Sequence, residues 1–564
     1  MEFQITRVSF SGGESVELLP ASLTVLLGPN NSGKSTALRD IRQYFASAAA
    51  TRNVISSVEH RQSGTGHEFL DWMRSSFPLR HPPGSPPHFA TRSHWTPETG
   101  IESQWESPDY ARHLHPFLVN HLGTDDRLTL ARYDSSINLI NDQPVRYIHV
   151  MQTKDAVEEA VRAYVRAAFG LDILINRGGG NQVGFHVGTE PNRTREQDRV
   201  SEGYLEELTK LPRLDDAGDG LKSYVGTILA AFCGVHPVLM LDEPEAFLHP
   251  PQARRIATVL AATARAHGRQ IIVATHSTDF VEGAVAADLP VTVCRITRDG
   301  DVNHARSVSP AELEQLWSRP LLRSSSAISG MFHEGVVLCE ADSDCRLYEA
   351  SIRRAESQGH TNRAVDLFFA HGGGKGALAS LASAYSKIGV KTAVIADLDL
   401  LRNPTQMRQV VEAVGGDWAS VQALATSAAS ALKDLGAEVT RDELKAQLDE
   451  ASNMLVAGDL PAEQRRQLQV ALADSAEWSK AKRSGLALLR GGARRDADGL
   501  IDRLSGMGVF LVPVGELEGW FPQGPADKPE WFAAALHELG SAPDTLPELT
   551  DFSSRILSFF GYVH

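Results

Sequence analysis

The chain has 564 residues, which is too long for one hydrophobic core, so roughly two to four domains are expected. An apolar content of 42% and a charged content of 22% are ordinary for a globular protein, and no run of about 18 apolar residues predicts a membrane span. The N-terminus lacks a signal-peptide core, and the 4 cysteines show no Cys-x-x-Cys spacing, so we expect a cytoplasmic protein without disulfides or zinc. The net charge of −15 argues mildly against a coat of nucleic acid, but it does not exclude a local basic groove.

The first recognisable motif is a phosphate loop. Residues 2–10 and 16–27 are predicted to be strands, and the second leads into Gly28-Pro-Asn-Asn-Ser-Gly-Lys-Ser-Thr36, followed by a helix to about Ala48. Glycines let the backbone point its N–H groups at phosphate oxygens, and the helix N-terminus adds partial positive charge. We expect Lys34 to reach the β- and γ-phosphates of ATP and Ser35 to bind Mg²⁺. The candidate nucleotide-binding residues of the loop are Asn30, Asn31, Ser32, Gly33, Lys34, Ser35 and Thr36.

The next stretch, residues 50–145, shows little periodicity. Several prolines between Pro78 and Pro87 interrupt any regular element, so we interpret the stretch as an insertion in the ATP-binding domain. A helix over 153–169 and short strands near 171–176 and 182–187 are predicted after it.

Two acidic residues then follow a buried strand. Residues 238–245 read Val-Leu-Met-Leu-Asp-Glu-Pro-Glu, an apolar run that ends on Asp242 and Glu243. Because open α/β sheets bind ligands at the carboxyl ends of their strands, we expect Asp242 to hold Mg²⁺ and Glu243 to orient an attacking water. A second apolar run ends in His276, a candidate donor to the γ-phosphate. The alternatives are an ordinary acidic turn and a structural histidine.

These motifs occur in the order of an ABC-type ATPase. Residues 1–320 resemble an SMC-like or OLD-type (overcoming lysogenization defect) ATPase domain. The resemblance implies that Gly218 and Gly220, which open a helix before the acidic strand, contact the nucleotide of another subunit, and hence that the protein is a dimer or tetramer. This turn departs from the usual Leu-Ser-Gly-Gly-Gln, and an ordinary capped helix is the alternative. A Q-loop glutamine is also expected, with Gln143 and Gln152 as candidates.

Residues 318–331 are predicted to be a linker, and acids again follow strands in the second half. A strand over 336–339 leads to Glu340, and a strand over 392–396 leads to Asp397 and Asp399. Residues i and i+2 of a strand share a face, so both aspartates can point at one cation, and Glu340 on the neighbouring strand completes an oxygen-rich Mg²⁺ site. Asp344 is a further candidate ligand. The Gly-rich segment 371–376 is expected to be a tight turn, and two ordinary strands with acidic turns are the alternative.

This spacing of a glutamate and an Asp-x-Asp pair resembles a Toprim domain, here residues 331–564 with a helical insertion over about 404–500. The resemblance implies an acidic residue after the last strand, near 508–513, that helps hold a second metal; Glu518 matches best and Glu516 is second. It also implies a catalytic lysine, for which Lys482 is the candidate. The basic cluster around it consists of Lys480, Lys482, Arg483, Arg490, Arg494 and Arg495, and either contacts phosphodiesters or is a solvated helix face.

The predicted fold class is therefore α/β, an ABC-type P-loop ATPase domain followed by a Toprim domain. That combination resembles the OLD-family nucleases, which include the Gabija ATPase–nuclease subunit. The resemblance implies nucleotide-regulated DNA cleavage with ATP and Mg²⁺ or Mn²⁺ in bacterial anti-phage defence, with DNA and a second defence protein as candidate partners. The alternative is an ATP-sensing regulator or scaffold whose Toprim half binds DNA or a partner without cleaving it.

Overall fold

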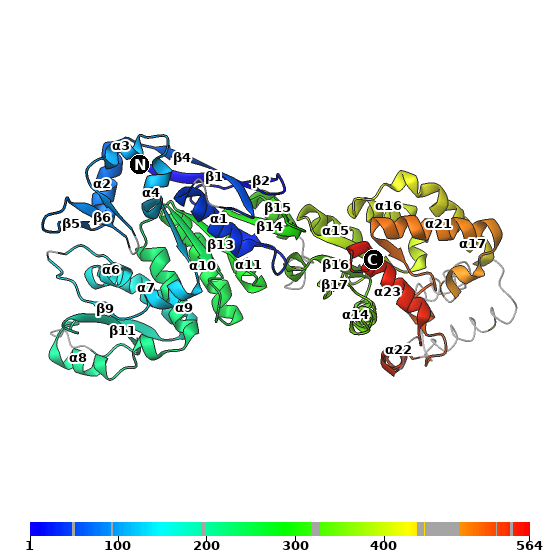
Figure 1. The fold of residues 1–564 in the computed structure, drawn as a ribbon. Helices are drawn as coiled ribbons and strands as arrows, with labels where there is room; N and C mark the ends of the chain where they lie inside the picture. The colour runs from blue at the N-terminus through cyan, green and yellow to red at the C-terminus, as the bar shows by residue number, and fades with distance from the viewer. Residues whose placement is uncertain are drawn as a thin grey trace, which may run out of the picture. The chain divides into compact units, whose positions relative to one another are not determined.

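The computed structural model describes residues 1–47, 51–91, 94–140, 142–192, 198–317, 328–436, 445, 482, 484–525, 527–541 and 545–563. The chain divides into two compact units, Met1–Arg319 and Pro320–His564, each with its own parallel sheet (Figure 1). None of the helices in these ranges combines the length and the apolar character that a membrane crossing requires.

The first unit is built on a six-stranded sheet in the order β15-β14-β3-β13-β12-β8. Five strands run parallel and β15 is antiparallel at one edge. Strands β3 and β13 are buried along their whole length, as expected for continuous apolar runs covered on both faces. The bounds of the strands are β3 (Leu23–Leu27), β8 (Val119–Leu122), β12 (Val238–Asp242), β13 (Gln270–Ala274), β14 (Val291–Asp299) and β15 (Val302–Val308).

Helices of the first unit pack directly against this sheet. Helix α1 (Lys34–Ala46) contacts β8, β12 and β13, and α10 (Pro250–Ala266) contacts β3 and β13. Helix α9 (Asp219–Cys233) packs against α10, and α11 (Thr278–Val285) follows β13. Because α1 begins directly after the β3 loop, the phosphate loop lies at the carboxyl edge of the parallel strands.

The prediction of one continuous strand over 16–27 is wrong, because the structure has two strands there. Strand β2 (Ser15–Glu17) pairs with β1 (Glu2–Phe10), while β3 joins the main sheet. Pro20 and Ala21 cause the break, since proline donates no backbone hydrogen bond and Ala21 adopts φ 47°.

The stretch 50–145 is more than an insertion. Strand β4 (Ile55–Ser63) pairs with β1, and β8 forms an edge of the main sheet beside β12. The remainder is folded as well, because Trp105 is fully buried and stacks on Phe69 with ring centroids 4.2 Å apart. Its other elements are α2 (Gly66–Ser76), β5 (Leu79–Arg80), β6 (His88–Ala90), β7 (Trp95–Pro97), α3 (Ile101–Trp105), α4 (Tyr110–Leu118), α5 (Thr124–Leu130) and β9 (Asp134–Ser135). The prolines shortened the elements without preventing a core.

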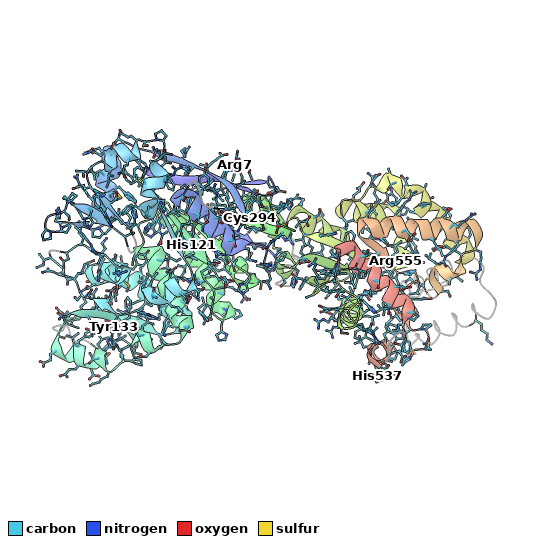
Figure 2. The ribbon with its side chains drawn as sticks, viewed as in Figure 1. Arg7, His121, Tyr133, Cys294, His537 and Arg555 are labelled. Atoms are coloured by element: carbon cyan, nitrogen blue, oxygen red, sulfur yellow. The ribbon has the colours of Figure 1, made fainter. Side chains whose placement is uncertain are left out.

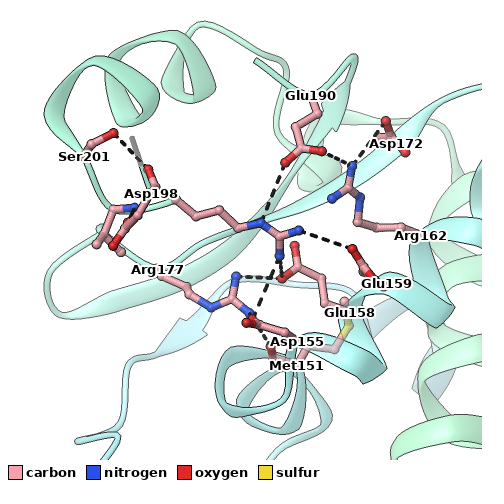
Figure 3. Close-up of polar contacts among 12 residues, drawn as sticks. Met151, Asp155, Glu158, Glu159, Arg162, Asp172, Arg177, Glu190, Asp198 and Ser201 are labelled. Atoms are coloured by element: carbon pink, nitrogen blue, oxygen red, sulfur yellow. Dashed lines mark hydrogen bonds and ion pairs between the residues drawn. The ribbon is translucent and has the colours of Figure 1, made fainter. Parts of the chain in front are cut away.

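The helix and strands predicted after this stretch are present as α7 (Asp155–Phe169), β10 (Asp172–Asn176) and β11 (Gln182–Gly188); α6 (Tyr147–Thr153), which was not predicted, precedes them and α8 (Glu202–Thr209) follows. A network of buried ion pairs joins α7 to its neighbours (Figure 3). Glu158 is 2% exposed at its side chain and lies 2.6 Å from Arg177 and 2.8 Å from Arg199, while Arg162 lies 2.6 Å from Glu190. Since a buried charge is tolerated only when it is paired, this network fixes α7 against the β10–β11 hairpin.

The second unit contains a four-stranded parallel sheet in the order β17-β16-β18-β19. Its strands are β16 (Gly335–Cys339), β17 (Leu367–His371), β18 (Lys391–Ala396) and β19 (Val509–Leu511), of which β16, β18 and β19 lie where the sequence predicts strands. The chain leaves β16 toward β17 on one side and later returns to β18 on the other. This reversal of strand order creates a crevice between the carboxyl ends of β16 and β18, where open sheets bind ligands.

Helices surround this sheet: α14 (Asp342–Ser357), α15 (Lys375–Lys387), α22 (Lys528–Ser541) and α23 (Pro547–Phe560). The predicted helical insertion contributes α16 (Pro404–Ala413), α17 (Gln422–Gly436) and α21 (Gly491–Met507), of which α17 packs against α21. Residues 437–444, 446–481 and 483 of the predicted insertion lie outside the described residues.

The linker prediction falls only partly on described residues, since 318–327 lie outside them. Residues 328–331 are not linker, because Ile328 and Met331 are buried in the second unit and a short 3₁₀ helix, η3 (Gly330–Phe332), begins there.

Candidate nucleotide site and acidic centre

The phosphate loop between β3 and α1 has the backbone that its glycines allow. Gly28, Asn31 and Gly33 adopt positive φ angles of 144°, 60° and 93°. A Cβ at Gly28 would lie 2.0 Å from the carbonyl oxygen of Ile296, so only glycine fits there. Lys34 Nζ donates to the carbonyl oxygens of Gly28 at 2.9 Å and Pro29 at 2.8 Å. The ammonium group is therefore held over the loop, at the place where phosphate oxygens are expected.

The remaining loop residues are fixed by local contacts. The carbonyl oxygen of Ser32 accepts from Asn303 Nδ2 at 2.8 Å, and Thr36 Oγ1 accepts from Arg39 at 3.0 Å. Asn30 is exposed. These contacts anchor the loop from outside, and within it the N–H of Ser32 donates to the carbonyl oxygen of Pro29 at 3.3 Å.

Ser35 and Asp242 meet as the sequence predicts. Ser35 Oγ, in the first turn of α1, donates to Asp242 Oδ1, at the end of β12, at 2.8 Å. Burial raises the pKa of Asp242. A hydroxyl and a carboxylate at this position are hard oxygen donors of the kind that Mg²⁺ prefers, so the donor set fits a nucleotide-bound magnesium ion.

Glu243 and His276 also come together, from the ends of β12 and β13. Glu243 Oε1 lies 3.0 Å from His276 Nδ1, and the backbone N–H of Glu243 donates to Ala274 at 2.8 Å. Glu243 adopts φ 49°, a backbone conformation that non-glycine residues rarely take and that is common at functional sites. The pair can position a water at the γ-phosphate, although its catalytic roles stay predictions.

Arg127 is a residue that the sequence analysis missed. Its buried guanidinium donates to the carbonyl oxygens of Asp242 at 2.5 Å and Glu243 at 2.6 Å. It comes from α5, directly after β8, in the stretch interpreted as an insertion. No sequence motif marks it, because its partners are backbone atoms of a strand far along the chain. These hydrogen bonds fix the backbone turn that orients the carboxylates of Asp242 and Glu243.

The turn that opens α9 stays a candidate for contact with another subunit. Gly218 is the N-cap, and a Cβ on it would meet no atom within 4 Å. A Cβ on Gly220 would lie 2.6 Å from the carbonyl oxygen of Phe247, so this turn packs on the loop that follows Glu243. Of the two Q-loop candidates, Gln152 donates to Ser136 Oγ at 3.1 Å, and Gln143 lines a cavity described below.

The acidic centre of the second unit lies at the crevice between β16 and β18. Glu340, Asp397 and Asp399 each offer a carboxylate oxygen, and these three atoms lie within 4.8 Å of one another. Glu340 Oε1 also accepts from the backbone N–H of Asp397 at 3.0 Å. The predicted residues therefore converge.

The reason given for this convergence from the sequence was wrong. Asp397 and Asp399 do not share a strand face, because β18 ends at Ala396 and Leu398–Arg402 form a 3₁₀ helix, η4. Leu398 and Leu400 are buried, which holds this tight turn in place and directs the aspartates to one side. The cluster arises from a turn at the sheet edge.

The buried position of the cluster shifts its titration. Burial, with the neighbouring Asp397, raises the pKa of Glu340 to about 7. Burial also raises the pKa of Asp397 to about 6. Ionised carboxylates this close repel one another unless a cation lies among them. Carboxylate oxygens are the donors that Mg²⁺ and Mn²⁺ take, so the residues present fit a divalent metal.

Two lysines contact the cluster, and the sequence analysis assigned only one of them. Lys375 Nζ is hydrogen-bonded to Asp399 Oδ1 and lies 3.7 Å from Glu340 Oε2. Lys482 Nζ lies 3.5 Å from Asp399 Oδ2. The segment 371–376 is the expected tight turn, with Gly373 and Gly374 at φ 70° and 133°, but it also delivers Lys375. The available signal was a lysine directly after three glycines at the carboxyl end of a strand.

The other metal candidates surround the cluster without joining it. Asp344 Oδ2 accepts from the N–H of Ala341 at 3.0 Å and so caps α14. Glu518 lies 2.7 Å from Lys528 Nζ, and burial, with Glu518 as a further cause, raises the pKa of Asp344. Glu516 is among the groups that raise the pKa of Asp397, after burial as the main cause. These acids adjoin the centre from a second side, and the choice between Glu516 and Glu518 stays open.

The predicted basic cluster is only partly described, since Lys480 and Arg483 lie outside the described residues. Arg490 donates to the carbonyl oxygen of Ala487 at 2.7 Å, and Arg494 bonds Asp498 at 3.0 Å. Among the described members of the cluster, Lys482 reaches the acidic centre, while Arg490 and Arg494 have local partners.

Fold and geometry together define a P-loop ATPase unit followed by a Toprim-type acidic centre. Residues 23–282 match the family model described as "AAA domain, putative AbiEii toxin, Type IV TA system", and residues 331–399 match "Overcoming lysogenization defect protein-like, TOPRIM domain". The chain therefore carries an AAA-type ATPase domain and an OLD-like Toprim domain. The predicted α/β fold class and the resemblance to the OLD family are confirmed.

Comparison with individual proteins adds a curated relative and several solved structures. The Old nuclease of Escherichia phage P2 is 28% identical over 172 residues, which is 29% of this chain and 28% of that protein, so the match spans little more than a quarter of the relative. An SMC head bound to the C-terminal winged-helix domain of ScpA is 13% identical with a TM-score of 0.34, over 55% of this chain and 99% of that one. CbiO1 of Clostridium perfringens, part of the ABC transporter complex CbiONQ, is 18% identical with a TM-score of 0.25, over 55% and 88%.

Proposed function

We propose that this protein is a nucleotide-regulated, divalent-metal-dependent DNA endonuclease that acts in bacterial anti-phage defence. The observation that carries the proposal is the convergence of Glu340, Asp397 and Asp399 at the strand-order reversal of a parallel sheet. The OLD-like Toprim match and the similarity to a protein named Old nuclease support it. The defence role rests on the family resemblance alone.

In this proposal the acids hold divalent metal, Mg²⁺ or Mn²⁺, whose chemistry is to activate a water and stabilise the leaving 3′-oxygen. Glu340, Asp397 and Asp399 bind one ion, and Asp344 with Glu518 or Glu516 supports a second. Lys375 and Lys482, already at the centre, stabilise negative charge on the scissile phosphate.

The ATPase unit supplies regulation. Lys34 and Ser35 bind the phosphates and Mg²⁺ of ATP together with Asp242, and Glu243 orients the attacking water with His276 beside it. We further propose a homo-oligomer of at least two chains. In ABC-type ATPases the signature turn of one subunit completes the nucleotide site of another, and the turn at Gly218 and Gly220 is our candidate for that turn. Light scattering that finds a monomer with full ATPase activity would contradict this arrangement.

The direct test combines purified protein with supercoiled plasmid and Mg²⁺ or Mn²⁺, with and without ATP. We expect cleavage that EDTA abolishes and that the nucleotide changes. Lys34→Ala should alter only the response to ATP, whereas Asp397→Ala should remove cleavage itself. If Glu340→Ala and Asp397→Ala proteins both cut as wild type does, the cleavage does not come from this centre.

A second candidate function is favoured by the two lysines. Lys375 and Lys482 place ammonium groups on the carboxylates and so neutralise part of their charge without any metal. In this alternative the Toprim unit is a binding platform for DNA or a partner, controlled by ATP sensing. It predicts ATP-dependent DNA binding, no cleavage, and no Mn²⁺ bound to the second unit in equilibrium dialysis.

A further inference from the structure

A large cavity lies in the ATPase unit, apart from the phosphate loop. Its volume is about 1000 Å³, at the upper end of the range for sites that hold small molecules. Residues 74–78 line one side, residues 143–157 line another, and β8 with residues 232–236 contributes further lining. His121 of β8, which lines the cavity, lies in the middle of this unit (Figure 2).

The cavity is distinct from the nucleotide site proposed above. Its lining includes none of residues 28–36, and neither Asp242 nor Glu243. Helix α1 contributes Arg42 and Ala46 from its far end, more than a turn beyond Lys34 and Ser35. A ligand here would not occupy the phosphate loop.

The charged side chains of the lining are mostly positive. Arg42, Arg132 and Lys154 have no carboxylate partner among the described residues, whereas Arg74 is paired with Glu98 at 2.8 Å. The acidic member of the described lining is Asp134, and Arg146 neutralises it at 3.2 Å. In a chain whose net charge is −15, this concentration of positive charge attracts anions to one cavity.

The positive charges are spread along the cavity. Arg42 comes from α1, Arg132 follows the end of α5, and Lys154 lies at the end of α6, so the positive charges come from three separate segments of the lining. An anion that satisfies these charges carries charge at more than one point, as a molecule with separated phosphate groups does.

Aromatic rings and imidazoles form another part of the wall. Phe77 packs edge-on against His236 with centroids 5.5 Å apart, and Phe232 against His267 at 6.0 Å. Burial lowers the pKa of His121 and of His236 to about 4, so both rings are neutral at pH 7. The buried atoms His121 Nε2 and His236 Nδ1 have no hydrogen-bond partner in the described part of the chain. The flat aromatic and imidazole rings of the wall suit a flat heterocycle.

We propose that this cavity is a second ligand site, separate from the phosphate loop, for a small anion of the nucleotide class that carries separated phosphate groups and a heteroaromatic base. A metal ion is not favoured, because the convergent metal-ligating group found among the described residues lies in the Toprim unit and not here. A DNA duplex is not favoured, because a cavity of about 1000 Å³ has the size of a small-molecule site. The proposal goes beyond the proposed nuclease function and does not depend on it.

Binding in a protein with a disabled phosphate loop provides the test. The Lys34→Ala protein is titrated by calorimetry with the 5′-phosphorylated dinucleotide pApA, and with pyrophosphate as a probe that lacks a base. We expect one pApA site per chain, and weaker binding of pyrophosphate. In the same background, Arg132→Glu and Lys154→Glu should each weaken pApA binding by about tenfold or more, since each removes a charge-assisted contact and adds repulsion.

Arg306→Glu is the matched control. Arg306 is an exposed arginine of β15 in the same unit, outside the cavity lining. It should leave pApA binding unchanged, and the melting temperatures should show that all variants fold, since Arg132 and Lys154 are exposed and have no carboxylate partner in the part of the chain that the structure describes. The proposal is overturned if Lys34→Ala protein binds no pApA, if Arg306→Glu weakens binding as much as the cavity variants do, or if a 20-nucleotide single strand binds through Arg132 and Lys154 while pApA does not. No arm of this test measures DNA cleavage, so its outcome is independent of the nuclease proposal.

Discussion

The nucleotide site and the acidic centre both lie at the carboxyl ends of parallel strands, but their charges are arranged differently. In the nucleotide site each ionisable group has a close partner of its own: Lys34 bonds loop carbonyls, Asp242 accepts from Ser35, and Glu243 meets His276. In the acidic centre three carboxylates share one small space, and the cations that approach them come from a turn and from the helical insertion.

This difference separates a site preformed by its backbone from one that, in our proposal, depends on an added cation. Gly28 and Gly33 shape the phosphate loop through their positive φ angles. The acidic centre instead holds partly buried carboxylates whose raised pKa values record the cost of ionising them. Loss of one charged group should therefore affect the two sites in different ways, and the predictions below test that contrast in order of decreasing effect.

The largest effect is expected for Asp397→Ala. It removes a carboxylate from the centre of the cluster, so metal-dependent plasmid cleavage should fall by about 10³-fold or more, while ATP hydrolysis stays within about twofold of wild type. Lys34→Ala should give the opposite result, with ATP hydrolysis lost and metal-dependent cleavage retained. Nicking assays with Mn²⁺ and phosphate release measure the two activities on the same preparations.

If Asp397→Ala lowers ATP hydrolysis as strongly as it lowers cleavage, the two centres are not separable. If it lowers neither, the acidic centre is not catalytic and the binding-platform function takes its place.

Glu243→Gln should come next in size. The glutamine keeps the shape of the side chain but cannot accept a proton from water, so ATP turnover should fall by about 10²- to 10³-fold while ATP still binds. His276→Ala should cost less, since His276 contacts Glu243 through one hydrogen bond. Single-turnover hydrolysis and nucleotide binding separate the two effects, and wild-type turnover by Glu243→Gln would remove that residue from its proposed role.

The same contrast explains how much the sequence could predict. The phosphate loop is contiguous, so its motif identified Lys34 and Ser35 and the strand before them. Glu340, Asp397 and Asp399 could be predicted because each follows an apolar strand, and strand ends of one parallel sheet meet at one edge. Their local geometry could not, since the pattern Asp-Leu-Asp reads equally as a strand or a tight turn.

The residues that were missed act across long sequence separations. Arg127 lies in a proline-interrupted stretch and donates to backbone atoms more than a hundred residues later, which leaves no side-chain pattern. Lys375 lies in a segment whose glycines were enough to predict a tight turn, so the sequence analysis gave the lysine no role. Lys482 was placed only by its proximity to other basic residues, and its contact with Asp399 depends on how the helical insertion folds back.

A smaller effect is expected when the internal cations are removed. Lys375 competes with metal for Asp399, so Lys375→Met, which keeps the apolar stem, should tighten Mn²⁺ binding by about tenfold, or about 1.4 kcal/mol. Lys482→Met should change it less, because that ammonium lies 3.5 Å from Asp399 and is 42% exposed, against 24% for Lys375. Electron paramagnetic resonance of free Mn²⁺ measures both affinities, and weaker Mn²⁺ binding in Lys375→Met would show that the lysine supports the metal rather than competing with it.

The smallest effect concerns the stability of the metal-free second unit. The folded protein raises the pKa of Glu340 from 4.5 to about 7, so between these values the folded state binds more protons than the unfolded state. Stability from this group is therefore highest at low pH and falls as pH rises through that window, and at pH 8 the full cost of a buried negative charge remains. In EDTA at pH 8, Glu340→Gln should raise the melting temperature by about 2 to 4 °C, about 1 kcal/mol after allowing for the lost contact with Lys375. At pH 5.5 the two proteins should melt closer together, and Mn²⁺ should stabilise only the wild type. A variant that is less stable than wild type at pH 8 would mean that Lys375 already offsets the charge of Glu340, and the acidic centre would then be as preformed as the phosphate loop.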